Sequence, residues 1–499
     1  MEQMFPKSNI SYLGNILHEV RNQELTQEIR LSDGMPDIGR VLASWGMPVI
    51  RGKEWRSDAV AVTGGVMLWV LYMPEDGTDP RCVENWIPFQ MEWDIPDVER
   101  EGQIRVQPLL RFVDARGVSA RKLMVRAGIA VLAEAMVPME AQVSMPEVTE
   151  PEVQLLKTTY PIRLPRHAGE KAFLLDEDLT FPASCPVPDK LISYTLQPEI
   201  TEQRISGDRV VFKGNANLHL LYRTGEGQLH TWDFELPFSQ LGNLEEVYDG
   251  DPQANVILCV TSLELGLEEM GHLRVKCGLV GQYAVSQRRL LELPQDAYGI
   301  GREVVPHMEQ LVMPAVLENR QEVLGAEQTV PQDGNIIVDV TFLPDFPRSR
   351  RFPDGVELEV PGQFQVLYYG DDGLLKSSTA RWTGNCRLPA GEEVLLNARI
   401  LPQGSANGFF SGSQMHLKSN VALDLETRTD KGIPMVTSLE IGQPLEADVG
   451  RPSLILRRAD GGSLWGIAKQ TGSTMEAIRM ANGLQSEPAQ GQMLLIPLS

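Results

Sequence analysis

The chain has 499 residues and is strongly acidic, with 45 Lys and Arg against 67 Asp and Glu and a formal net charge of −22. Its length is enough for about three or four domains, and its hydrophobic fraction of 42% is enough to build folded cores. The acidic balance excludes nucleic acid and anionic lipid surfaces as expected partners, because binding to phosphates depends on basic side chains that release counterions.

The N-terminal segment predicts neither a secretion signal nor a membrane anchor. Charged side chains are spread through residues 1–22 and no apolar block interrupts them. No stretch of the chain approaches the roughly 18 apolar residues that a membrane helix needs. The five cysteines are scattered singly, and an odd, sparse number favours a reducing compartment. We therefore expect a cytoplasmic protein with no membrane insertion.

Three segments of the chain share one alternating pattern, at residues 60–72, 210–222 and 356–368. Apolar side chains recur at every second position and each segment ends in Leu-Tyr, a pattern typical of a half-buried strand. The terminal tyrosines are Tyr72, Tyr222 and Tyr368. We expect them to pack in cores or at strand edges, with a shared interaction surface as the second possibility.

A glycine in an acidic turn follows each of these strands. The three glycines are Gly77, Gly227 and Gly373. Glycine supplies the positive φ that a tight hairpin turn requires, so each strand is expected to turn back into a second one.

A tryptophan follows each turn, and a further short strand comes later in each set. The tryptophans are Trp86, Trp232 and Trp382, and we expect them to anchor cores because an indole buries a large apolar area. Four landmarks in the same order, three times over, predict three copies of one mainly-β domain. A small sandwich or an open barrel is the expected architecture.

Proline-rich stretches at residues 137–153, 306–317 and 442–452 predict connectors between the copies, because proline removes a ladder donor. The expected domains are repeat 1 at 1–145, repeat 2 at 146–310, repeat 3 at 311–448 and a C-terminal domain at 449–499.

The last fifty residues predict a small β-α-α-β domain. A strand at 453–457 leads to a turn in which Ser463 is a good helix N-cap. Leu464, Ile467 and Ala468 then share one helical face. A Ser-x-x-Glu capping box at 473–476 opens a second helix.

The second helix is expected to turn Met475, Ile478 and Ala481 inward and to stop near Asn482 and Gly483. A closing strand at 491–497 completes the domain.

These C-terminal motifs closely resemble the LysM domain. The resemblance covers residues 454–497 and rests on Gly-Gly-Ser-Leu-Trp-Gly-Ile-Ala at 461–468, Ala-Asn-Gly-Leu at 481–484 and Gly-Gln-Met-Leu-Leu-Ile-Pro at 491–497. It implies a shallow groove between two loops that binds glycans containing N-acetylglucosamine, such as peptidoglycan. The implied groove residues are Gly461, Gly462, Ser463, Leu464 and Trp465 on one side and Asn482, Gly483, Leu484 and Gln485 on the other. The family usually has Asp where this chain has Gly462.

The three upstream copies are similar to SPOCS domains, the spore-coat-associated repeats of endospore-forming Firmicutes. The resemblance rests on the strand that ends in Leu-Tyr and on the acidic glycine turn, and it covers most of residues 24–440. Three such repeats followed by one LysM domain resemble the clostridial spore coat morphogenetic adaptors. That resemblance implies binding to the ATPase of the coat basement layer, in the mother cell and at the forespore surface, with the LysM domain used against protein.

Three hypotheses for the function follow from these patterns. The first is a non-enzymatic scaffold that links the coat basement-layer ATPase to other spore coat proteins. The second is a peptidoglycan-binding protein of the cell wall or spore cortex, which would need export. The third, an enzyme with a LysM anchor, lacks a catalytic motif.

Catalytic, metal and cofactor chemistry find no support in the sequence. The seven histidines form no metal-ligand spacing, and no Cys-x-x-Cys pair is present. Gly299-Ile-Gly301 begins a dinucleotide fingerprint, but residue 304 is Val and no long helix is expected after it. No Gly-x-Ser-x-Gly elbow appears. We expect no enzyme activity, no metal and no cofactor.

Overall fold

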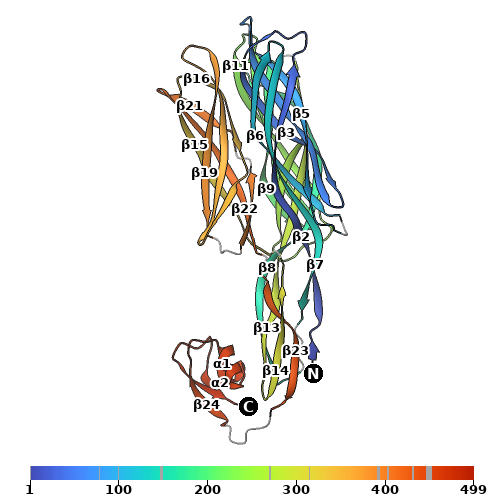
Figure 1. The fold of residues 1–499 in the computed structure, drawn as a ribbon, viewed down its shortest axis with the longest axis vertical. Helices are drawn as coiled ribbons and strands as arrows, with labels where there is room; N and C mark the ends of the chain where they lie inside the picture. The colour runs from blue at the N-terminus through green and yellow to red at the C-terminus, as the bar shows by residue number, and fades with distance from the viewer. Residues whose placement is uncertain are drawn as a thin grey trace.

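The structure is a computed structural model that describes residues 2–77, 79–98, 101–145, 150–268, 271–313, 315–389, 394–401, 404–429, 432–445 and 452–498. It is built almost entirely of β-strands (Figure 1), which confirms the mainly-β class. The described residues contain two helices, both near the C-terminus.

The first group of strands forms two three-stranded sheets that pack face to face. It consists of β2 (Lys7–Arg30), β3 (Ile38–Trp55), β4 (Ala59–Pro74), β5 (Arg81–Asp94), β6 (Gln103–Ser119) and β7 (Lys122–Ser144). The sheet orders are β2-β7-β6 and β3-β4-β5, all antiparallel. Side chains from both sheets, such as Leu68 and Ile129, share one core. We call this group unit 1.

The next strands repeat these orders. Unit 2 consists of β8 (Val153–Thr180), β9 (Pro188–Ser206), β10 (Arg209–Thr224), β11 (Leu229–Asn243), β12 (Gln253–Leu267) and β13 (His272–Gly299). Its sheets are β8-β13-β12 and β9-β10-β11, which correspond strand for strand to those of unit 1.

The third group, unit 3, has more and shorter strands. They are β15 (Ala315–Pro331), β16 (Ile336–Pro344), β17 (Arg348–Phe352), β18 (Gly355–Tyr369), β19 (Leu375–Leu388), β20 (Val394–Leu401), β21 (Asn407–Ser411) and β22 (Gln414–Thr429). Here β18 pairs with β16, β17 and β19, and β22 pairs with β15, β20 and β21. One residue pair, Arg163 with Val316, joins β8 to β15.

A separate small sheet lies below the three units in Figure 1. Its order is β1 (Glu2–Met4), β23 (Ile433–Pro444) and β14 (Arg302–Leu311), so it combines the N-terminus with the segments that follow units 2 and 3. The long strands β2, β7, β8 and β13 run down towards it.

This arrangement corrects the expected connectors. Residues 137–144 belong to β7 and pair with β2, and residues 306–311 belong to β14 and pair with β23. Proline is tolerated here because each stretch has one partner strand. The pairing of β6 with β7 ends at Met136, before Pro138. Among the described strands, β14 pairs with β23 alone. A strand with an open edge can do without an N–H donor on that side. Residues 146–149, 314 and 446–451 of these stretches lie outside the described residues.

The turn glycines behave as predicted. Gly77, Gly227 and Gly373 have φ angles of 69°, 85° and 71° and connect the expected strand pairs. The tyrosines Tyr72, Tyr222 and Tyr368 are no more than 2% exposed, which confirms their core position.

One expectation about the cores is wrong. The strand that ends in Leu-Tyr is not half-buried in unit 1, because the outer face of β4 is covered as well: Trp69 is 1% exposed and packs edge to face on Tyr194 of unit 2, with ring centroids 4.6 Å apart. The three tryptophans predicted to anchor cores are partly buried, and each packs against a hydrophobic core. Trp86, for example, lies over Gly65 of the neighbouring strand on the outer face of its sheet, where only a glycine leaves room for the indole.

Candidate functional sites

The C-terminal module, residues 452–498, contains the site predicted from the sequence. It is built from β24 (Leu454–Arg458), α1 (Leu464–Thr471), α2 (Met475–Asn482) and β25 (Met493–Pro497), with β24 antiparallel to β25. The Ser463 side chain caps α1 by accepting a hydrogen bond from the Gly466 N–H at 3.1 Å. The cap of α2 is Thr474 rather than Ser473, whose hydroxyl instead bonds the Pro497 carbonyl. Ile478 is buried as expected, but Ala481 is exposed.

The first predicted loop lies largely in solvent. Gly461 has a φ of 89°, and the Gly462 N–H donates to Asp460 Oδ1 at 3.2 Å. Asp460 therefore closes the turn from two residues upstream of Gly462. Gly461, Gly462 and Ser463 are all exposed, so their backbone is accessible to a ligand.

The next two predicted site residues point away from solvent. Leu464 is fully buried in the module core, and its N–H donates to Glu487 Oε2 at 2.6 Å. Trp465 is 8% exposed and packs edge to face on Tyr298 of β13, with ring centroids 4.7 Å apart. Neither side chain is open to a ligand in this arrangement.

The second predicted loop is held to the closing strand. The Asn482 amide donates to the Leu495 carbonyl at 2.6 Å and accepts from the Leu495 N–H at 2.7 Å. Gly483 is left-handed with a φ of 60° and ends α2. Leu484 is partly buried, whereas Gln485 is exposed. Asn482 thus has a structural role, and Gly483 and Gln485 offer the accessible surface of this loop.

Asp296 at the end of β13 fixes the module to unit 2, and the sequence patterns did not reveal it. Its carboxylate accepts from the Trp465 indole N–H at 2.8 Å and from Lys469 Nζ at 2.7 Å. Partial burial alone would raise the pKa of Asp296, but the hydrogen bonds from Lys469 and Trp465 outweigh burial and lower the pKa. The Tyr298 hydroxyl adds a bond to the Ser473 carbonyl at 2.7 Å. The contact between the module and β13 therefore combines an ion pair, Lys469 with Asp296, and an aromatic contact, Trp465 with Tyr298.

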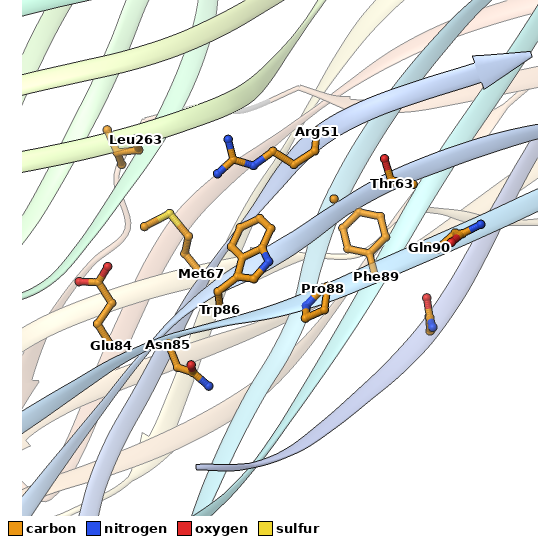
Figure 2. Close-up of a pocket in the computed structure, with 12 residues that line it drawn as sticks. Arg51, Thr63, Met67, Glu84, Asn85, Trp86, Pro88, Phe89, Gln90 and Leu263 are labelled. Carbon is orange, nitrogen blue, oxygen red and sulfur yellow. The ribbon is translucent and has the colours of Figure 1, made fainter. Parts of the chain in front are cut away.

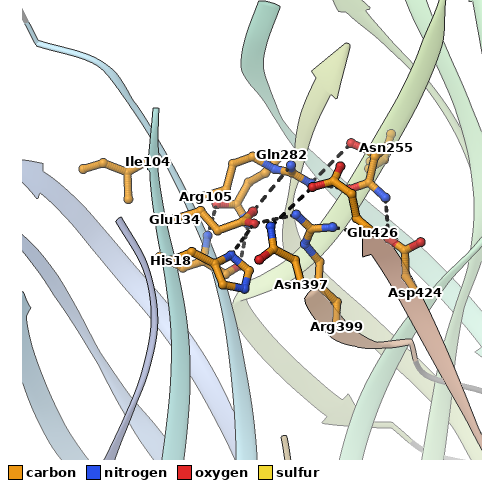
Figure 3. Close-up of polar contacts among 12 residues, drawn as sticks. His18, Ile104, Arg105, Glu134, Asn255, Gln282, Asn397, Arg399, Asp424 and Glu426 are labelled. Atoms are coloured by element: carbon orange, nitrogen blue, oxygen red, sulfur yellow. Dashed lines mark hydrogen bonds and ion pairs between the residues drawn. The ribbon is translucent and has the colours of Figure 1, made fainter. Parts of the chain in front are cut away.

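A buried ion network lies where the three units meet (Figure 3). Glu134 of β7 is 2% exposed and contacts Arg105 of unit 1 and Arg399 of unit 3. His18 Nδ1 lies 3.0 Å from the same carboxylate, and Arg105 also donates to Asn255 of unit 2. Because every unit supplies a member, this network fixes how the units sit against one another.

Electrostatics within the network favour the charged forms. Burial alone would raise the pKa of Glu134, but Arg399 and Arg105 outweigh burial and hold the pKa well below its usual value. Burial lowers the pKa of Arg105 to about 10, so it remains charged at neutral pH. One sequence signal does point to this site, because Glu134 is a lone charge in the apolar run Ile129-Ala-Val-Leu-Ala-Glu-Ala-Met136.

The surface has two depressions of note. One, of about 910 Å³, lies on the outer face of β5 around Trp86 (Figure 2). The guanidinium of Arg51 lies 5.3 Å from the centroid of the Trp86 indole, and the ring also lies against Gly65. Both contacts are within the protein. The other, of about 600 Å³, is a cleft between units 2 and 3 with walls from all three units.

The described residues show no arrangement suited to metal binding, and burial makes two of the thiols less reactive. No group of three or more His, Cys, Asp or Glu among them could hold a metal ion. All five cysteines are free, and burial raises the pKa of the Cys82 and Cys259 thiols to about 12. These two thiols are therefore protonated at neutral pH and are weak nucleophiles. No helix in the described part of the chain is long and apolar enough to cross a membrane.

Comparison with known proteins gives one family. Residues 188–266, from the start of β9 through nearly all of β12, match the family model described as SipL, SPOCS domain. No curated protein and no solved structure matches the chain.

Proposed function

We propose that this protein is a non-enzymatic scaffold or adaptor in spore coat assembly. The observation that carries the proposal is the SPOCS match over residues 188–266, because this domain suggests a role in sporulation and spore coat assembly. The strand orders of units 1 and 2 are the same, which supports more than one copy of that domain in the chain. The proposed location is the mother cell cytoplasm at the forespore surface.

The C-terminal module supplies the proposed contact with the coat basement-layer ATPase. Its order of one strand, two helices and one strand, with the Ser463 cap and the left-handed Gly472 and Gly483, supports a LysM domain. The accessible part of the groove consists of backbone at Gly461 and Gly462 together with Gly483 and Gln485. The partner would therefore contact mainly loop backbone and polar side chains, while Leu464 lies in the module core and Trp465 contacts β13.

The test is calorimetry of the full chain against the purified basement-layer ATPase and, separately, against chitohexaose and muropeptides. The adaptor role predicts binding to the ATPase that is weakened by Gln485→Ala in the groove. Gln228→Ala, the same change at an exposed position in the β10–β11 turn, is the control and should bind normally. Binding to the glycans without binding to the ATPase would replace the adaptor role with a peptidoglycan-binding one.

A further inference from the structure

The cleft between units 2 and 3 has a polar wall formed by the outer face of β9-β10-β11. Successive outward positions place Glu199 beside Asn215 and place Gln197, Asn217 and Glu235 in one row across the three strands. This face lies within residues 188–266 and carries mainly amide and carboxylate groups, with His219 between Asp233 and Asp339 at one end. The carboxylates accept hydrogen bonds, and each amide both donates and accepts them. Such a surface favours a ligand rich in hydrogen-bond donors.

Two carboxylates on this wall, Glu199 and Glu235, lack cationic partners, whereas Asp233 is paired with His219. Neither Glu199 nor Glu235 forms an ion pair with any Lys, Arg or His of the described chain. Burial and the charge of Glu235 raise the pKa of Glu199 despite a hydrogen bond from Asn217. Two negative groups on one wall without a counter-charge attract a cation.

A third acceptor lies on another wall of the cleft. Gln107 of β6 is 7% exposed and donates its amide N–H to the Ile400 carbonyl. Its Oε1 atom has no hydrogen-bond partner although it is buried. A buried acceptor without a donor is costly, so a ligand N–H at this point would stabilise the complex.

The shape of the cleft suits an extended chain. The residues of β9 that line it are Thr195 to Ile200 and Gln203, and they span about 26 Å at roughly 3.3 Å per residue. Phe342 of β16 and Leu258 of β12 give apolar contact on other walls. A small amine would fill only part of this length.

We propose that the cleft binds an extended segment of a partner protein that carries lysine or arginine side chains. The cationic groups pair with Glu199 and Glu235, and the amides of Gln197, Asn215 and Gln107 bond the segment's backbone. A neutral saccharide would leave the carboxylates without a counter-charge, which is why a basic peptide is favoured. This site goes beyond the adaptor role, because it lies outside the C-terminal module.

The test measures fluorescence anisotropy of the full chain with a labelled peptide of about nine residues that alternates Lys and Ser, which matches the length of the cleft. The peptide should bind, and Glu199→Gln and Glu235→Gln should each weaken binding about tenfold, since each removes one charged hydrogen bond. Glu202→Gln is the matched control: it lies on the same strand outside the cleft, pairs with Lys213, and should leave binding unchanged.

Three outcomes would overturn the proposal: no binding of the Lys peptide, equal binding of a Glu-Ser peptide, or unchanged affinity in both glutamate variants. Displacement of the peptide by spermine at equal charge would show that the ligand is a small polyamine. Binding of chitohexaose alone would show that it is a saccharide, and either result would contradict a polypeptide ligand. Circular dichroism melting checks that each variant folds. Normal capture of the basement-layer ATPase by Glu199→Gln would separate this cleft from the proposed function of the module.

Discussion

The outer faces of two corresponding sheets differ sharply in units 1 and 2. When the strands that end in Leu-Tyr are aligned at their tyrosines, Met67 and Trp69 of β4 correspond to Asn217 and His219 of β10. The first face packs on unit 2, and the second opens on the cleft. One strand pattern therefore serves either to join units or to present a polar surface, and the outward residues differ accordingly.

The largest effect is expected where the apolar face is covered. Trp69→Ala should destabilise the protein by about 3–5 kcal/mol, because it leaves a cavity against Tyr194. Asn215→Ala, on the polar face of β10, should cost less than about 0.5 kcal/mol. Denaturant unfolding measures both, and similar losses in the two variants would contradict the difference between the faces.

The open cleft also depends on the junction that holds unit 3 in place. Glu134→Gln should destabilise the fold by about 3 kcal/mol, because Arg105 and Arg399 stay buried without their counter-charge. Glu24→Gln removes a carboxylate from the exposed pair with Arg126 and should cost less than about 1 kcal/mol.

The junction also predicts an acid dependence. Because the pKa of Glu134 is lower in the folded protein than its ordinary value of 4.5, its contribution is present above that value and is lost as the pH falls below it. When the pH is lowered from 5, the melting temperature of the Glu134→Gln variant should therefore fall less than that of the native chain. Parallel curves would show that Glu134 is not the group responsible.

His219 in β10 corresponds to Trp69 in β4. It joins unit 2 to unit 3 through its contact with Asp339. Its ring nitrogens lie 2.6 Å from Asp233 and 2.9 Å from Asp339. Burial opposes protonation, but the hydrogen bonds to these carboxylates outweigh burial and raise the pKa to about 10. The stability it adds is complete below about pH 6.5 and is lost as the pH rises towards 10. His219→Gln should remove that alkaline slope in a melting series, and an unchanged slope would assign it elsewhere.

A smaller effect is expected at the contact between the module and β13. Asp296→Asn should weaken docking by about 1 kcal/mol, because it removes the ion pair with Lys469 but keeps an acceptor for Trp465. Hydrogen exchange in α1 should accelerate. Glu476→Gln in α2 removes an exposed charge that forms no ion pair with described residues, and faster exchange in that control would contradict a specific role for Asp296.

The hairpin turns should show an effect of similar or smaller size. Gly77→Ala should cost about 1 kcal/mol from backbone strain alone, because a Cβ there meets no atom within 4 Å and φ is positive. Gly225→Ala, also in open space but without a positive φ, should be close to neutral. Denaturant unfolding measures the stability of both variants. Equal free energies of unfolding would show that the positive φ of Gly77 has no cost for alanine.

The sequence by itself determined the local features of this protein. Period-two alternation indicated strands, glycine in an acidic turn indicated a positive φ, and a serine before an apolar face indicated the cap of α1. Each of these depends on side chains and backbone within a few residues.

Tertiary structure alone decided which outward faces are covered and which polar groups meet. Whether β4 or β10 is buried on both sides depends on the strand that packs across it, which alternation within one strand does not encode. Glu134 and Arg399 come together from residues 265 positions apart, and Trp465 finds Asp296 across 169. Pro138 and Pro306, which suggested connectors, lie in strands, where the open edge beside them needs no donor. In each case the deciding contact lies between segments that are far apart in the chain.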